Sequence, residues 1–205
     1  MNHALDAALA GLFDFAGMYP PASLGLEEAL QASASFPKTL KRPGLVGADL
    51  VLGVDKLREL DARALAGNGF AGGRPFRACL LGAPLQSPAH DFSEDRGRIQ
   101  AFNGAGEERR IVSYEFKLES GGRVHREDLK GLLAGARSLP GDILVFAEPD
   151  LSGPSFSDIL RELGAALADL NEQGEGPRIG LKVRGAGPTA VDAPRLAHAI
   201  IEVCR

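Results

Sequence analysis

The sequence predicts an α/β fold built on a parallel sheet, arranged like a barrel of about six βα units, with an incomplete TIM barrel as one form of it. Short apolar runs alternate along the chain with longer amphipathic segments, which is the pattern of repeated βα units. The amphipathic segments place apolar residues at helical spacings of three and four. In several apolar runs the charged residues occupy alternate positions only, so they share one face of a strand. A barrel can hold such charges at its mouth.

The apolar runs have the length of sheet or barrel strands, and Gly- and Pro-rich loops separate them. The predicted strands cover residues 11–17, 48–54, 76–82, 111–119, 142–148 and 178–184.

The amphipathic segments predict helices over residues 27–36, 55–65, 125–137, 156–170 and 193–204, with a weaker pattern over 91–104. Asp55 precedes one of these helices as a cap, and Asp192 precedes Pro194 at a first-turn position. All 205 residues are expected to form one domain. A closed eight-unit barrel needs about 250 residues, so the sheet is either open or a shortened barrel.

Composition excludes several classes of function. The net charge of −4 and the pI near 5.6 leave no basic surface for nucleic acid. Cys79 and Cys204 lack the spacing of a disulfide framework or a zinc site. Residues 1–15 lack the basic start of a secretory signal and carry Asp6 and Asp14, and no apolar run reaches ~18 residues, so neither a secretory signal nor a membrane span is expected. We therefore expect a cytoplasmic protein with no nucleic-acid or membrane partner.

Strand parity points to the functional face. In the run 111–119, every second residue is apolar or aromatic, and the residues between them are Ser113, Glu115, Lys117 and Glu119. In IGLKVRG, Gly180, Lys182 and Arg184 stand opposite three aliphatic residues. A doubly wound sheet buries both faces and could not satisfy such charges, whereas a barrel holds them at its C-terminal mouth. An antiparallel sheet with one wet face is the alternative.

The predicted catalytic residues are Lys182, Glu148 and Glu115. A partly desolvated lysine near Arg184 and Lys117 would favour its amine, as a Schiff-base nucleophile requires. Glu115 or Glu148 would then transfer protons. The alternative is an ion pair between Lys182 and one of these glutamates that only satisfies the barrel interior.

Substrate binding is assigned to Arg184, Asp14, Lys117 and Tyr19. Arg184 and the glycines of RGAG could clamp an anion. Asp14 of the first predicted strand is placed at the barrel mouth, and Tyr19 lies on a loop stiffened by two prolines.

No cofactor is expected, and no metal is assigned. Glu115, Glu148, Asp14 and Asp150 form a plausible oxygen-ligand set for Mg²⁺ or Mn²⁺. However, none of the four histidines stands at a predicted strand end.

Two stretches resemble signatures of an uncharacterised bacterial protein family with a barrel-like layout. FDFAGMYPPASL is similar to its aspartate, aromatic, Ala-Gly, Pro-Pro-Ala stretch, and LKVRGAG followed by APRLAHAIIEVC is similar to its Lys-x-Arg-x-Gly-Gly strand and helix. Ala186 departs from that pattern, which favours glycine there. The family continues into a further barrel segment, so the resemblance implies a chain truncated after Arg205. It implies no particular activity.

The pattern as a whole predicts a lyase or isomerase type of enzyme for a small anionic carbonyl or sugar-phosphate-like substrate. The alternative is a non-catalytic ligand-binding or assembly module. An incomplete barrel would expose strand edges at LFDFAG and IGLKVRG. Such a chain should form a homodimer through those edges, cover them or aggregate.

Overall fold

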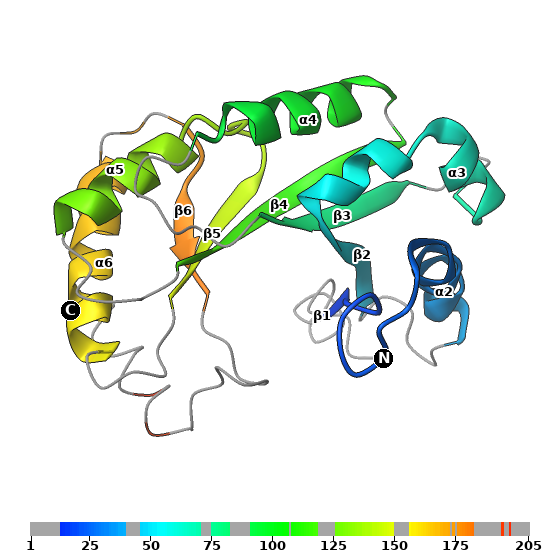
Figure 1. The fold of residues 1–205 in the computed structure, drawn as a ribbon, viewed down its shortest axis with the longest axis horizontal. Helices are drawn as coiled ribbons and strands as arrows, with labels where there is room; N and C mark the ends of the chain where they lie inside the picture. The colour runs from blue at the N-terminus through cyan, green and yellow to red at the C-terminus, as the bar shows by residue number, and fades with distance from the viewer. Residues whose placement is uncertain are drawn as a thin grey trace, which may run out of the picture. The chain divides into compact units, whose positions relative to one another are not determined.

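The computed structural model confirms the predicted alternation of strands and helices (Figure 1). It describes residues 13–39, 46–70, 75–82, 91–106, 108–118, 126–149, 156–172, 174, 176–182, 194 and 197. The strands are β1 (Phe13–Phe15), β2 (Val46–Gly53), β3 (Phe76–Leu81), β4 (Arg109–Leu118), β5 (Leu144–Pro149) and β6 (Ile179–Leu181). The helices are α2 (Leu26–Thr39), η2 (Val54–Glu59), α3 (Ala62–Gly67), α4 (Ser93–Gly104), α5 (Arg126–Ala136) and α6 (Phe156–Glu172).

All six predicted strands are present in one parallel sheet, in the order β1-β2-β3-β4-β5-β6. This is the α/β fold that the βα alternation predicts. Strand order follows sequence order because each helix returns the chain to begin the neighbouring strand. Closure of the sheet into a barrel stays a prediction.

The chain divides into two compact units. The first comprises Met1–Leu81 and Arg98–Val112, and the second comprises Gly82–Gly97 and Ser113–Arg205. Each unit is described by itself below, and the predicted single domain stays a prediction.

The core of the first unit lies on one face of β2 and β3. Leu50, Leu52, Ala78 and Leu80 point to this face and are fully buried. Helix α2 packs against β2. The ring of Phe76 meets that of Phe102 edge-on, with centroids 6.0 Å apart. These contacts seat α4 against β3.

The predicted helix over residues 55–65 is wrong in one respect, because it is two short helices. The 3-10 helix η2 ends at Glu59, and the backbone becomes extended at Asp61, with φ −82° and ψ 173°. The Asp61 carboxylate accepts a hydrogen bond of 2.7 Å from the Ala64 N–H. Asp61 thus caps a new helix, α3. The predicted cap at Asp55 is also wrong, since Gly53 precedes η2 without a side-chain cap bond.

The second unit buries the apolar parity of β4, β5 and β6. Tyr114, Phe116, Val145, Ala147 and Ile179 are each at most 3% exposed. The ring of Phe92 packs edge-on against both aromatic residues of β4. Helices α5 and α6 lie side by side (Figure 1), and α6 also contacts β6. The apolar stripes predicted for residues 125–137 and 156–170 therefore face the core. The predicted helix over 193–204 lies outside the described residues except at positions 194 and 197.

An asparagine near the end of a helix fixes the start of the next strand in two places. Asn103 Oδ1 accepts a hydrogen bond of 2.7 Å from the N–H of buried Ile111 at the start of β4. Asn171 Oδ1 accepts one of 3.4 Å from the N–H of Ile179 at the start of β6. Both asparagines also donate to the carbonyl of the same strand residue. Eight residues separate the partners in both cases.

We expect Asn103→Ala to lower the free energy of unfolding by roughly 1–2 kcal/mol, because the buried Ile111 amide loses its acceptor. Gln100→Ala, at an exposed site on the same helix, is the matched control and should change stability by less than about 0.5 kcal/mol. Urea denaturation of both variants measures the difference. Equal effects would show that Asn103 does not anchor the strand.

Candidate functional site

The polar residues of β4, β5 and β6 share one face, as strand parity predicts. In the parallel register, Glu115 stands beside Phe146, and Lys117 stands beside Glu148. Phe146 in turn stands beside Gly180. Lys182 follows on the same parity as Gly180, and its N–H donates to the Ala147 carbonyl over 2.9 Å. We call Glu115, Lys117, Glu148 and Lys182 the charged face.

Lys182 and Glu115 form the central contact of the charged face. The ammonium Nζ donates to Glu115 Oε2. The Glu115 side chain is 7% exposed, whereas that of Lys182 is 40% exposed. The carboxylate is therefore part of the interior, and the amine reaches the surface. This pair is the one that the sequence analysis offered as the structural alternative to a nucleophile.

Glu148 is the second buried carboxylate of this face, at 4% exposure. Ala147 on β5 pairs with Leu181 on β6. Glu148 and Lys182 are the next residues on these strands, so they stand beside each other. Lys117 lies across from Glu148 and is half-buried. Two carboxylates and two amines thus occupy adjacent positions at the C-terminal ends of three strands.

Gly180 leaves room for an aromatic ring at the base of this face. A Cβ at position 180 would lie 3.1 Å from two ring carbons of Phe146. The ring therefore covers the backbone of β6 directly below Lys182. This close approach explains why glycine stands on the otherwise charged parity of IGLKVRG.

Asp14 belongs to the first unit and has a different neighbourhood. Across β2 and β3, Arg77 donates to buried Asp49 through Nε at 2.8 Å and Nη2 at 3.2 Å. Chiefly this hydrogen bond, with smaller contributions from the charges of Asp49 and Asp14, raises the pKa of Arg77 above its ordinary value. The contribution of the Arg77 charge to stability is fully present below the ordinary arginine pKa and is lost only as pH rises through the raised value.

Asp49 and Arg77 were not predicted from the sequence as interacting residues. Both stand on predicted strands, at the polar positions of ADLVLG and FRACLL. The register that pairs Leu50 with Ala78 also brings Asp49 beside Arg77. A comparison of the polar positions on these two predicted strands could have identified the pair.

Tyr19 and the remaining predicted residues lie elsewhere or outside the described part of the chain. Tyr19 is half-buried in the turn after β1, where its N–H bonds the Ala16 carbonyl over 3.0 Å. Arg184 and Asp150 lie outside the described residues. The structure therefore brings together Glu115 and Lys182, with Lys117 and Glu148 on the same face. Convergence of Asp14 and Tyr19 with them stays a prediction.

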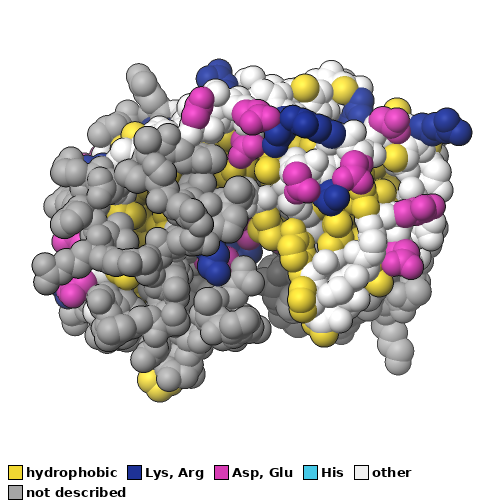
Figure 2. Space-filling model, in the orientation of Figure 1, with side chains coloured by type: hydrophobic (Ala, Val, Ile, Leu, Met, Phe, Trp, Pro, Cys, Tyr) yellow, Lys and Arg dark blue, Asp and Glu magenta, His cyan; other side chains and the backbone are white. Residues whose placement is uncertain are grey.

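The described residues contain no group of three or more His, Cys, Asp and Glu side chains that could hold a metal ion. Among the same residues, no helix combines the length and apolarity that a membrane crossing requires. On the described surface in Figure 2, basic side chains are interspersed with acidic ones.

The chain has no significant match among protein-family models, curated proteins or solved structures. The family resemblance of its two motifs stays a prediction.

Proposed function

We propose that the protein is an enzyme of lyase or isomerase type that acts on a small anionic carbonyl compound, including sugar-phosphate-like substrates. One observation carries the proposal: a half-exposed lysine, Lys182, directly after β6, contacts a buried glutamate, Glu115, on β4, across the strand β5 that pairs with both. Parallel α/β folds keep their chemistry at the C-terminal ends of their strands. The lysine can meet a ligand from solvent while its partner is held by the core.

The proposed reaction begins with Schiff-base formation at Lys182. Glu115 accepts one ammonium proton, and the resulting amine attacks the carbonyl carbon. The new C–N bond forms, and the carbonyl oxygen leaves as water with two of the three original ammonium protons. Glu115 returns its proton in that step. The product is a protonated imine, so charge and atoms balance.

The imine then accepts electrons from an adjacent bond. Cleavage of a neighbouring C–C bond gives a lyase, and removal of a neighbouring proton gives an isomerase. Glu148 is the proposed second proton carrier, because it shares the charged face and follows the register to Lys182. Lys117 on this face, and Arg184 two residues beyond Lys182, are the proposed partners of the substrate anion, with Asp14 and Tyr19 as further substrate-binding residues.

The ion pair also favours a second function, a non-catalytic ligand-binding or assembly module. In that case the Lys182 ammonium only neutralises the Glu115 carboxylate, and the charged face organises the interior. Both functions predict the same contact, so they differ only in whether Lys182 reacts.

Borohydride trapping separates these two functions. Wild-type protein is incubated with pyruvate, glyoxylate or dihydroxyacetone phosphate, reduced, and analysed by intact mass. We expect a covalent adduct with at least one compound and its loss in Lys182→Arg, which keeps the positive charge but forms no Schiff base. Lys130→Arg, on α5 and outside the charged face, is the matched control and should retain the adduct. A wild-type protein that forms no adduct on Lys182 would support the non-catalytic module.

The expected association through strand edges is tested separately. β1 and β6 end the strand order, and such strands offer unpaired backbone groups unless they are covered. We expect light scattering coupled to size exclusion to report a homodimer at micromolar concentration. A strictly monomeric protein would argue for covered edges or a closed sheet.

A further inference from the structure

An aromatic side chain, Phe146, lies in the middle of the charged face. In the parallel register it stands between Glu115 on β4 and Gly180 on β6. Glu148 is two residues further along β5, so its carboxylate and the Phe146 ring project from the same face of the strand. Both glutamates are buried, whereas Phe146 is half-buried. The apolar ring is therefore more accessible to solvent than the two acids beside it.

The Lys182 side chain passes beside this ring. Lys182 stands beside Glu148 on β5. Its ammonium nevertheless contacts Glu115 on β4, whose neighbour on β5 is Phe146. To reach from β6 to β4, the stem of the lysine crosses β5 between the positions of Glu148 and Phe146. The amine is therefore held next to the ring, at the place where a carbonyl compound would meet it.

Gly180 keeps the ring out of the path of the lysine. A Cβ at position 180 would lie 3.1 Å from the ring carbons Cδ1 and Cε1 of Phe146, which is closer than the usual carbon contact of about 3.5–4.0 Å. The ring therefore leans over β6, and the glycine backbone supports one side of it. A larger residue at position 180 would force the ring away from β6. Glycine thus lets an aromatic side chain and the stem of Lys182 share this face.

The ring and Lys117 divide the surroundings of the amine into two parts. Lys117, the proposed partner of the substrate anion, stands beside Glu148, so the anionic group lies toward the strand ends. The other substituent of the carbonyl carbon is then directed toward Phe146. A hydroxyl group packed on the ring would give up its hydrogen bonds with water without gaining a partner, whereas an aliphatic or aromatic group gains from the contact.

From this geometry we propose that the substrate is a 2-oxo acid with an apolar side chain that packs on the Phe146 ring. Lys117 and Lys182 flank the same residue of β5, so their amines can meet adjacent groups of one small molecule, as a carboxylate next to a carbonyl requires. The inference rests on the proposed Schiff-base function and narrows its substrate class. Hydroxylated, sugar-phosphate-like compounds become the poorer substrates, and Phe146 becomes a specificity-determining residue that Gly180 positions.

Borohydride trapping over a concentration series tests the substrate class, with pyruvate and 4-methyl-2-oxopentanoate as the two probes. Both are 2-oxo acids, so they share the carboxylate and the carbonyl and differ in the size of the apolar body. We expect half-maximal modification of the wild-type protein at a concentration of 4-methyl-2-oxopentanoate at least about tenfold lower than that of pyruvate. Dihydroxyacetone phosphate should require a higher concentration than 4-methyl-2-oxopentanoate. Loss of each adduct in Lys182→Arg assigns it to Lys182.

Variants of Phe146 then test the contact itself. Phe146→Ala should bring the ratio of the two concentrations to within about twofold of one, because the apolar body loses its contact. A loss of folded protein or of reactive amine affects both acids alike and cancels in this ratio. Phe146→Gln, which retains more of the side-chain volume, should lower the ratio in the same way and serves if the alanine variant is unstable. Leu144→Ala is the matched control, because Leu144 is apolar, 60% exposed and on the same face of β5, but farther from Lys182. It should keep the wild-type ratio.

The outcomes separate this inference from the proposed function. Adducts on Lys182 with a wild-type ratio near one, or with a ratio unchanged in both Phe146 variants, would overturn the inference and leave the proposed function standing. A preference for dihydroxyacetone phosphate over both acids would do the same. If none of these compounds forms an adduct on Lys182, the proposed function fails and the inference fails with it.

Discussion

Lys182→Gln is expected to lower the free energy of unfolding by about 2–3 kcal/mol, more than Glu115→Gln does. The reason is the unequal burial of the two partners, since the Glu115 side chain is 7% exposed and that of Lys182 is 40% exposed. Loss of the ammonium removes a partner from a carboxylate in the interior. Loss of the carboxylate charge leaves an ammonium that reaches water, which costs about 1 kcal/mol or less.

Urea denaturation of the two single variants and the double variant measures this asymmetry. The double variant should recover part of the loss seen in Lys182→Gln, because the buried charge is then absent. Lys130→Gln is the control, because Lys130 pairs with the more exposed Asp169 over 3.0 Å and should matter little. Equal losses in Lys182→Gln and Glu115→Gln would contradict the assigned burial.

Gly82→Ala is expected to destabilise the protein by about 2–3 kcal/mol through overpacking. Gly82 follows β3, and its N–H bonds the Glu115 carbonyl over 2.8 Å. A Cβ there would lie 2.1 Å from the Tyr114 hydroxyl oxygen. Tyr114 is fully buried and donates to Asp95 Oδ2 over 2.5 Å, so its ring has little freedom to move away.

The partner in this test is Tyr114→Phe, measured alone and together with Gly82→Ala. The hydroxyl is the atom nearest the added methyl group, so its removal should make the double variant more stable than the sum of the two losses predicts. Gly97→Ala is the control, because a Cβ at this helix position meets nothing within 4 Å, and it should be neutral or stabilising. Strict additivity of the two changes would show that the methyl group does not meet the hydroxyl.

The sheet and its charged face follow from local pattern. The alternation of Glu115 and Lys117 with Tyr114 and Phe116 is a property of neighbouring residues, and a strand turns it directly into two faces. The polar face of β4 and its opposite, apolar face were therefore predictable. On β6, the sequence shows only that Gly180 is an exception among the charged residues of its face. Its cause, the ring of Phe146 on the next strand, depends on the register.

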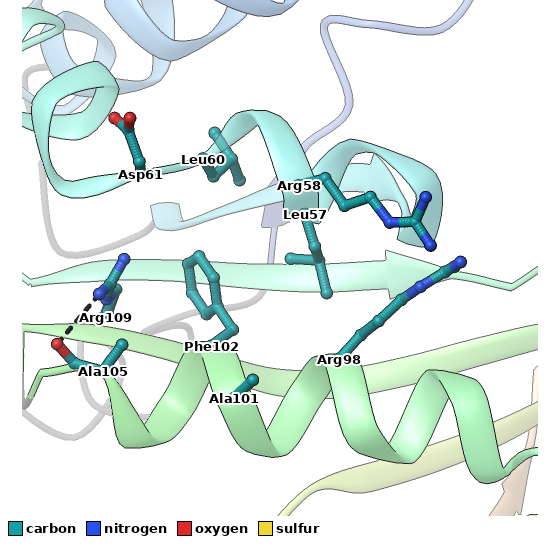
Figure 3. A pocket seen from close by; sticks show the side chains of 9 residues that line it. All are labelled: Leu57, Arg58, Leu60, Asp61, Arg98, Ala101, Phe102, Ala105 and Arg109. Atoms are coloured by element: carbon teal, nitrogen blue, oxygen red, sulfur yellow. Dashed lines mark hydrogen bonds between the residues drawn. The ribbon is translucent and has the colours of Figure 1, made fainter.

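Features that depend on distant partners were not predictable in the same way. The periodicity of residues 55–65 fits one helix, and only the bond from Ala64 to Asp61 shows where a second helix begins. Asp49 and Arg77 meet because two strands align, which a single strand does not reveal. A hollow lined by Leu57, Phe102 and Arg109 takes these three residues from η2, α4 and β4 (Figure 3). No spacing in the sequence links them.

The most direct test of the central claim, that Lys182 is a reactive amine at the C-terminal ends of β4, β5 and β6, is peptide mapping after brief treatment with pyridoxal phosphate and borohydride. This probe is a small anionic aldehyde, and the other lysines serve as internal controls. The account predicts that Lys182 is modified faster than Lys56, Lys117 and Lys130, and that Glu115→Gln removes this preference. Modification of Lys182 at the same rate as those lysines, unchanged in Glu115→Gln, would contradict it.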